Sequence, residues 1–112
     1  MASGYLRKNG FRIIEKNWRS RRGEVDLVAQ KKQVLYFVEV KLRKNSAFGK
    51  GEESIHPMKQ RKMVSAALDY LQRMKKGPQQ DVRFGALVVD GGHLPPRFEW
   101  IEFPLDLPLQ YY

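Results

Sequence analysis

Residues 23–41 read Gly-Glu-Val-Asp-Leu-Val-Ala-Gln-Lys-Lys-Gln-Val-Leu-Tyr-Phe-Val-Glu-Val-Lys, and the rest of the chain can be placed around this stretch. Its two halves, residues 24–30 and 34–41, are rich in branched and aromatic side chains, and the polar residues 31–33 separate them. This pattern is typical of two antiparallel strands joined by a short turn. We therefore expect a hairpin here.

The flanking segments predict a sheet with helices. Before the hairpin we expect the end of a short helix at 4–8, a strand at 11–18 and a basic turn at 19–23. After it we expect a long loop at 43–57, a helix from Pro57 to a stop at Gly77-Pro78, strands at 82–89 and 98–103, and an irregular tail from 104 to 112. This order, helix–strand–strand–strand–helix–strand–strand, predicts an α/β (α+β) domain with a mixed sheet.

Apolar residues indicate where the core lies. One stripe with helical spacing follows the second helix, comprising Met63, Val64, Ala67, Leu68, Leu71 and Met74. Residues 82–89 form an apolar run without alternation, which is typical of a central strand covered on both faces. We also expect Trp18 to pack in the core.

Length and composition exclude several classes of protein. The 112 residues predict a single domain, 1–112. Cysteine is absent, which excludes disulfide scaffolds, thiolate metal sites and thiol chemistry. No apolar run is long enough for a membrane span, and residues 1–20 lack the apolar core of a signal peptide. We expect a cytoplasmic protein with no membrane partner.

The charge is strongly basic and unevenly distributed. The chain has 21 Lys and Arg against 12 Asp and Glu, a net charge of +9. Residues 1–50 carry 13 basic and 4 acidic side chains, whereas residues 77–112 carry 2 and 5. This asymmetry favours a polyanionic partner, most simply nucleic acid; an acidic membrane or an acidic protein are the alternatives.

Three carboxylates of the basic half, and one lysine, lie inside expected strands, where charged groups are disfavoured. They are Glu24, Asp26, Glu39 and Lys41. A turn of two or four residues places all four on one face, and one such register puts Asp26 opposite Glu39. A three-residue turn sends Glu39 to the other face. In the clustered register, Val25, Leu27, Val38 and Val40 form the opposite, core-facing set.

Two readings of this cluster remain open. The structural one is a salt bridge between Lys41 and a carboxylate on a solvent-facing side of the sheet. The chemical one is a pair of carboxylates, Asp26 and Glu39, that holds Mg²⁺ or Mn²⁺, which prefer oxygen ligands and accept substrate phosphates. Lys41 would then act on the attacking water or on the charge that develops at phosphorus.

The ordered motifs resemble a known family. Gly23-Glu-Val-Asp-Leu-Val28, Phe37-Val-Glu-Val-Lys41, Phe48-Gly49 and Lys59-Gln60-Arg61 are similar to the YraN-type uncharacterised bacterial family. The pattern Asp-x(n)-Glu-x-Lys also resembles the PD-(D/E)xK nuclease superfamily, which includes relatives of Holliday-junction resolvases. The resemblance covers about residues 2–105.

The resemblance implies a restriction-endonuclease-like core and a metal-dependent site. Asp26, Glu39 and the backbone carbonyl of Val40 would ligate Mg²⁺, Lys41 would be the catalytic lysine, and Glu24 would belong to the same motif. The family's longer first helix carries a Gly-Glu pair that this sequence lacks, so we expect a shortened first helix.

Basic residues on both sides of these motifs are candidates for contacts with a phosphate backbone. They are Arg19, Arg21, Arg22, Arg43, Lys44, Lys59, Arg61 and Lys62, and the resemblance adds Gln60. For the cations early in the second helix, simple solvation is the alternative.

Three functions compete at this stage. The first is a Mg²⁺-dependent endonuclease acting on DNA, with branched DNA as a candidate substrate. The second is a module of the same fold that binds nucleic acid without cleaving it. The third is a scaffold for an acidic protein. The resemblance to resolvases and the apolar residues of 104–112 also suggest a homodimer.

Overall fold

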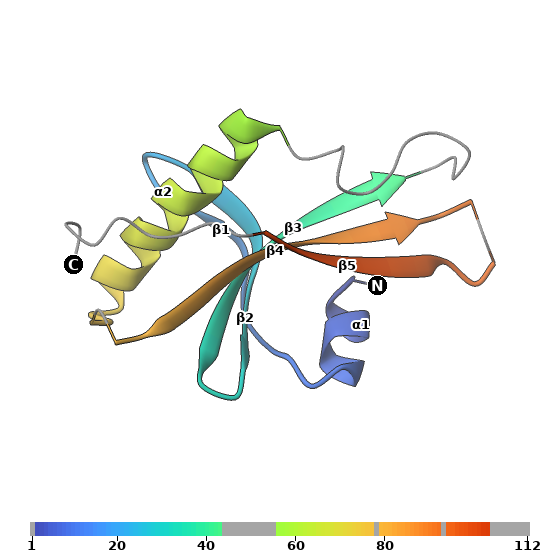
Figure 1. Ribbon diagram of the computed structural model, residues 1–112, viewed down its shortest axis with the longest axis horizontal. Helices are drawn as coiled ribbons and strands as arrows, with labels where there is room; N and C mark the ends of the chain where they lie inside the picture. The colour runs from blue at the N-terminus through green and yellow to red at the C-terminus, as the bar shows by residue number, and fades with distance from the viewer. Residues whose placement is uncertain (1, 44–55, 78, 93, 104–112) are drawn as a thin grey trace.

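The computed structural model of this chain describes residues 2–43, 56–77, 79–92 and 94–103, which form two helices and five strands (Figure 1). In chain order these are α1 (Ala2–Lys8), β1 (Arg12–Arg19), β2 (Glu24–Lys31), β3 (Val34–Arg43), α2 (Pro57–Arg73), β4 (Asp81–Asp90) and β5 (Arg97–Phe103). The predicted order of elements is confirmed. The predicted long loop and the tail, with Lys44, Phe48-Gly49 and residues 104–112, lie largely or wholly outside the described residues.

The five strands form one mixed sheet in the order β1-β2-β3-β4-β5. Only the β3–β4 pair is parallel, and the other neighbours are antiparallel. Parallel neighbours need a crossover connection, and α2 lies in the segment that joins β3 to β4. Strand β4 lies inside the sheet, between β3 and β5, and its residues 84–90 are all buried, as the apolar run predicted.

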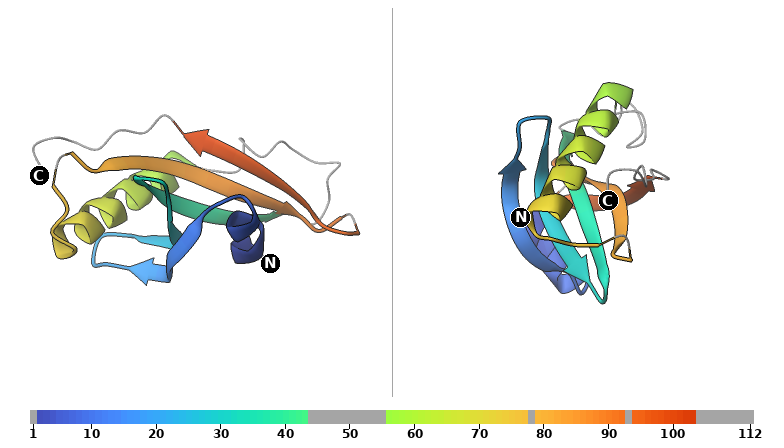
Figure 2. Two further views of the ribbon diagram at one scale, coloured as in Figure 1. Left: turned by 90° about the horizontal axis from the view of Figure 1, so that it is seen from below. Right: turned by 90° about the vertical axis from the view of Figure 1, so that its left-hand side faces the viewer.

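The two faces of the sheet carry separate apolar clusters. Beneath α2, Phe37, Phe84 and Val28 pack with Met63 and Tyr70 of the helix. On the other face, Leu6 of α1 packs with Leu27, Val38 and Leu87. Helices α1 and α2 therefore cover opposite faces, as Figure 1 shows, and the twisted sheet curves around α2 (Figure 2).

The register of the central hairpin follows from its turn. Lys31 pairs with Val34, so that only Lys32 and Gln33 form the turn, and Lys32 has a φ of 58°. Positive φ at a central turn residue matches the twist of two-residue hairpins. Leu27 consequently lies opposite Val38. This is the register in which the next pair would be Asp26 and Glu39, one of those predicted.

Two predictions about the core were wrong. Val25 belongs to the cluster beneath α2, together with Val28, and not with Leu27 and Val38 on the other face. Val25 lies directly opposite Trp18 in the β1–β2 register, and both residues pack in the cluster beneath α2. Met74 caps α2 after its last residue and is 40% exposed.

Helix α2 begins where the sequence predicts, and for a recognisable reason. The Nδ1 atom of His56 accepts a hydrogen bond from the Met58 amide at 3.0 Å, and Pro57 occupies the first turn. His56 thus satisfies one of the amides that a helix start leaves unpaired. The start of α2 is fixed, and with it the positions of Lys59 and Gln60 above the sheet.

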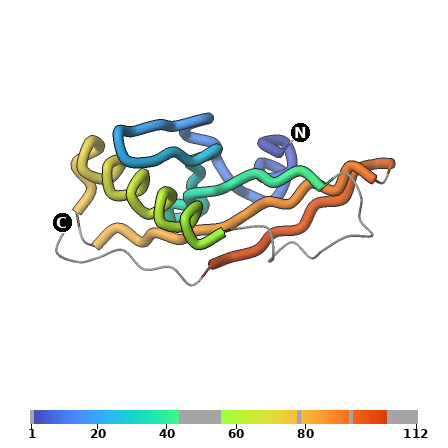
Figure 3. Tube along the Cα trace, turned by 90° about the horizontal axis from the view of Figure 1, so that it is seen from above, coloured from blue at the N-terminus to red at the C-terminus, as the bar shows by residue number. Residues whose placement is uncertain are grey.

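The β1–β2 hairpin lies directly against α2 (Figure 3). At Gly23 an added Cβ would lie 2.1 Å from the backbone carbonyl oxygen of Lys62. Trp18, 8% exposed, packs edge-on against Tyr70 of α2, which confirms its predicted place in the core. Glycine at position 23 therefore lets the basic turn approach the helix backbone.

Within the described residues, neither helix has the length and apolar character needed to cross a lipid bilayer.

The close approach at Gly23 makes a stability prediction. Gly23→Ala should lower the free energy of unfolding by about 1–3 kcal/mol, because the methyl group overpacks against helix backbone that cannot easily move. Gly4→Ala is the matched control, since nothing lies within 4 Å of an added Cβ in exposed α1, and it should be neutral or stabilising by up to about 1 kcal/mol. Urea denaturation of both variants measures this. Equal stability of Gly23→Ala and the parent would contradict the contact.

Candidate functional site

Strand β3 carries Glu39, Val40 and Lys41 out from under α2. Alternation places Glu39 on the same face as Phe37, which packs beneath the helix. Glu39 is buried, with 7% of its surface exposed, whereas Lys41, two residues later, is exposed. The strand therefore passes from core to solvent within the motif itself.

The Asp26 carboxylate binds the backbone of β3. Its Oδ2 accepts a hydrogen bond from the Val40 amide at 2.7 Å. The β2–β3 ladder ends at Leu27 and Val38, so the side chain takes the place of the next backbone acceptor. In an extended strand the amide and carbonyl of one residue face the same side, so the Val40 carbonyl faces β2 as well. Asp26 thus lies beside Val40, one residue from Glu39.

Glu39 receives its counter-ion from α2. The Nζ atom of Lys59 lies 2.7 Å from Oε2 of Glu39, and the lysine side chain is 32% exposed. The other carboxylate oxygen, Oε1, is buried and has no hydrogen-bond partner among the described residues. Burial of a carboxylate oxygen without a hydrogen-bond partner is unfavourable. Oε1 of Glu39 is therefore the polar atom of the site whose burial costs the most free energy.

The predicted site residues are brought together only in part. Asp26 binds the backbone at Val40 where β2 and β3 separate, and Glu39 and Lys41 flank Val40 on β3. Among the described residues Lys41 forms no salt bridge; Lys59 is the lysine paired with Glu39. Glu24 is exposed and pairs with Arg19 across the β1–β2 hairpin, Oε2 to Nε, at 3.0 Å. Within the described part of the chain, no three Asp, Glu or His side chains form a metal-binding group.

Most of the predicted nucleic-acid-binding residues lie in two groups. Arg19, Arg21 and Arg22 are exposed in and beside the β1–β2 turn, and Lys59, Gln60, Arg61 and Lys62 occupy the first turns of α2. Arg43 ends β3, half-buried and next to Asp90 in the parallel register. Lys59 was predicted to contact phosphate or solvent, and its pairing with Glu39 was not foreseen.

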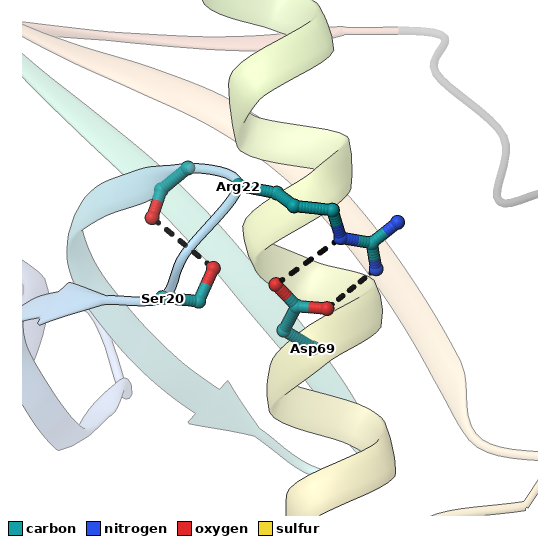
Figure 4. Close-up of polar contacts among 4 residues, drawn as sticks. Ser20, Arg22 and Asp69 are labelled. Atoms are coloured by element: carbon teal, nitrogen blue, oxygen red, sulfur yellow. Dashed lines mark hydrogen bonds and ion pairs between the residues drawn. The ribbon is translucent and has the colours of Figure 1, made fainter.

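The basic turn is anchored to the helix by an ion pair (Figure 4). Nε and Nη2 of Arg22 reach from the turn to the two carboxylate oxygens of Asp69 on α2. The hydrogen bond from Arg22 holds the pKa of Asp69 below its usual value, against the opposing effect of burial. Sequence reasoning missed Asp69, although it is the one acidic residue in α2 and its isolation was a signal.

This ion pair predicts a pH dependence. Because the pKa of Asp69 is lowered in the folded state, its contribution is present above the unfolded value near 3.8 and is lost as pH falls through the folded value. Asp69→Asn should lower stability at pH 7 by up to about 1 kcal/mol, since Arg22 is partly solvent-screened. The gap between variant and parent should close below about pH 3.8. Thermal unfolding across pH 2–7 measures it, and a gap that widens in acid would contradict the pairing.

The comparisons with known proteins agree in pointing to one family. A profile described as "Uncharacterised protein family UPF0102" matches residues 1–89. A UPF0102 protein of Anaeromyxobacter dehalogenans is 43% identical over 99 residues, which cover 88% of this chain and 73% of that protein. Those of Dichelobacter nodosus and Pseudomonas aeruginosa are 41% and 36% identical, covering 91% and 95% of this chain and 80% and 86% of those proteins. The chain therefore belongs to the UPF0102 family.

Proposed function

We propose that this protein is a Mg²⁺- or Mn²⁺-dependent endonuclease of the PD-(D/E)xK type that hydrolyses phosphodiester bonds in DNA, with branched DNA as a candidate substrate. The observation that carries the proposal is the buried Glu39 carboxylate, whose Oε1 has no partner among the described residues. It lies beside Val40, whose amide is held by Asp26.

The donor set fits a hard divalent cation. Asp26 and Glu39 contribute carboxylate oxygens, and the Val40 carbonyl faces the same side as the amide that Asp26 binds. Mg²⁺ and Mn²⁺ prefer oxygen ligands and keep open positions for water and substrate phosphate. A cation there would also satisfy Oε1 of Glu39 and neutralise the carboxylate pair. Asp26, Glu39 and Val40 are thus the proposed ligands.

The other catalytic and binding roles belong to side chains of the protein. A bound cation supplies Lewis-acid stabilisation of the charge that develops on the phosphate. Lys41 is exposed at the point where β3 leaves α2, so its ammonium can orient the attacking water and stabilise the equatorial oxygens. Water adds to phosphorus and releases a proton to solvent, the P–O ester bond breaks, and the leaving oxygen takes a proton from solvent. The exposed cations of α2 and of the β1–β2 turn bind the phosphate backbone of the nucleic acid.

A second candidate is a module that binds nucleic acid without cleavage. It is favoured by Lys59, whose ammonium already neutralises Glu39 and lies where a metal would compete with it. Calorimetric titration with Mn²⁺ separates the two functions, together with cleavage assays on linear, flap and four-way DNA in Mg²⁺ or Mn²⁺. If the parent protein binds DNA but neither binds Mn²⁺ nor cleaves any substrate, the nuclease proposal is wrong and the non-catalytic binding module is the function that remains.

Ligand and lysine variants should behave differently. Asp26→Asn and Glu39→Gln should weaken Mn²⁺ binding and abolish cleavage, because each removes an anionic ligand. Lys41→Ala should retain the Mn²⁺ and DNA affinities and lose about 10²–10⁴ in cleavage rate. Cleavage by all three variants at the parental rate would place any activity elsewhere in the protein, or in a contaminant.

The Lys59–Glu39 pair predicts competition for the site. Lys59→Gln should tighten Mn²⁺ binding by about fivefold, because the metal no longer displaces an ammonium worth ~1 kcal/mol. It should also lower metal-free stability by about 1–3 kcal/mol, since Glu39 becomes a buried charge without a counter-ion. Lys62→Gln, one turn along α2 and exposed, is the control and should leave Mn²⁺ affinity unchanged. Weaker Mn²⁺ binding by Lys59→Gln would contradict the competition.

A further inference from the structure

A pocket lies between the β1–β2 turn and the C-terminal half of α2, away from the carboxylates. Its volume is about 740 Å³, and it is lined by Ser20, Arg21, Arg22, Asp69, Gln72 and Arg73. We call it the arginine pocket. A smaller depression of about 250 Å³ adjoins it, shares residues 20–22 and extends along α2 to Lys62. The two form one basic surface along the helix.

Two of the three arginines in the pocket are held in place. Asp69 binds Arg22 through both of its carboxylate oxygens, and the guanidinium of Arg73 stacks over the Trp18 ring, 5.8 Å from its centroid. Arg21 is exposed and forms no salt bridge among the described residues. The single carboxylate is matched by Arg22, so Arg21 and Arg73 give the pocket its excess positive charge.

The chemistry of this pocket fits phosphate. Guanidinium groups bind phosphate oxygens through two parallel hydrogen bonds, and fixing them beforehand reduces the entropy lost on binding. Lys62 and Lys59 continue the basic surface along α2 toward Glu39. A ligand that contacts this whole surface, from the arginine pocket to the carboxylates, must carry phosphates at intervals along an extended chain.

Helix geometry sets the distance between the two places. Lys59 and Arg73 are fourteen residues apart on α2, which corresponds to about 21 Å at roughly 1.5 Å per residue. Along one strand of duplex DNA, charges are spaced by about 3.4 Å along the axis, so this span matches about six phosphates.

We propose that the arginine pocket is an anchoring site for a nucleic-acid backbone phosphate, about six nucleotides from the carboxylate site. The assignment rests on the proposed function in that the ligand is nucleic acid, but it requires neither metal nor cleavage. It adds Arg73 and Gln72, which the sequence did not indicate, to the binding surface. It also makes affinity depend on substrate length.

The test measures binding of a 20-base-pair DNA duplex by fluorescence anisotropy. Arg21→Gln and Arg73→Gln should each weaken binding of the 20-base-pair duplex by roughly fivefold, and the salt slope of log affinity should become shallower by about one unit per lost contact. Arg7→Gln on α1, on the opposite face of the sheet, removes the same charge and should change neither the affinity nor the salt slope.

Several results would overturn the proposal. They are an unchanged affinity of Arg21→Gln and Arg73→Gln for the duplex, or an equal loss of affinity in Arg7→Gln. Binding of polyglutamate as tightly as DNA would assign the pocket to an acidic protein instead. Arg21→Gln keeps the test valid if loss of the Trp18 contact unfolds Arg73→Gln. The Mn²⁺ affinities of the same variants should match that of the parent. Failure of the parent to bind Mn²⁺ would contradict the nuclease proposal and would leave the proposal for the arginine pocket unaffected.

Discussion

The two-residue turn at Lys32 and Gln33 fixes the register of the β2–β3 hairpin, and the position of every polar group in the candidate site depends on it. Strand β3 is apolar on both faces, with Phe37 beneath α2 and Val38 beneath α1. Burial alone therefore distinguishes weakly between two registers that differ by one residue. A slip would turn Glu39 toward the apolar cluster of α1, away from Lys59. The turn thus specifies a register that hydrophobic packing leaves open.

Local patterns in the sequence were sufficient for the elements and their order, because alternation acts over a few residues and is readable in 23–41. They left the length of the hairpin turn open, and the observed register is one of those predicted. The rest depends on contacts between distant segments. Val25 could not be assigned to its face, because its place beside Trp18 beneath α2 depends on the pairing of β1 with β2. The pair between Lys59 and Glu39 arises only when the β3–β4 crossover places α2 over the strand.

Helix α2 connects the two charged regions of the molecule. Its first turn supplies Lys59 to Glu39, its middle lies against Gly23, and its later turns hold Arg22 through Asp69. Cations in a first turn oppose the helix dipole, and Lys59 offsets that cost by pairing with a buried carboxylate. A basic turn would otherwise have little reason to lie on a helix, but Asp69 and the missing side chain at Gly23 give it one. The position of α2 over the sheet therefore also determines where the basic residues of the β1–β2 turn lie.

Glu39 is a poor choice if its role is structural. One of its oxygens is paired and the other is buried without a partner among the described residues, so the Lys59 contact compensates only part of the desolvation of the carboxylate. An apolar side chain would fill the same position beside Phe37 and leave Lys59 free to reach solvent. Local rules are broken at functional sites when a ligand supplies the missing stabilisation. A hard cation bound by Asp26 and Glu39 would supply it, whereas a non-catalytic phosphate-binding surface needs neither carboxylate. The unsatisfied oxygen is therefore the physical reason to favour metal-dependent chemistry over simple nucleic-acid binding.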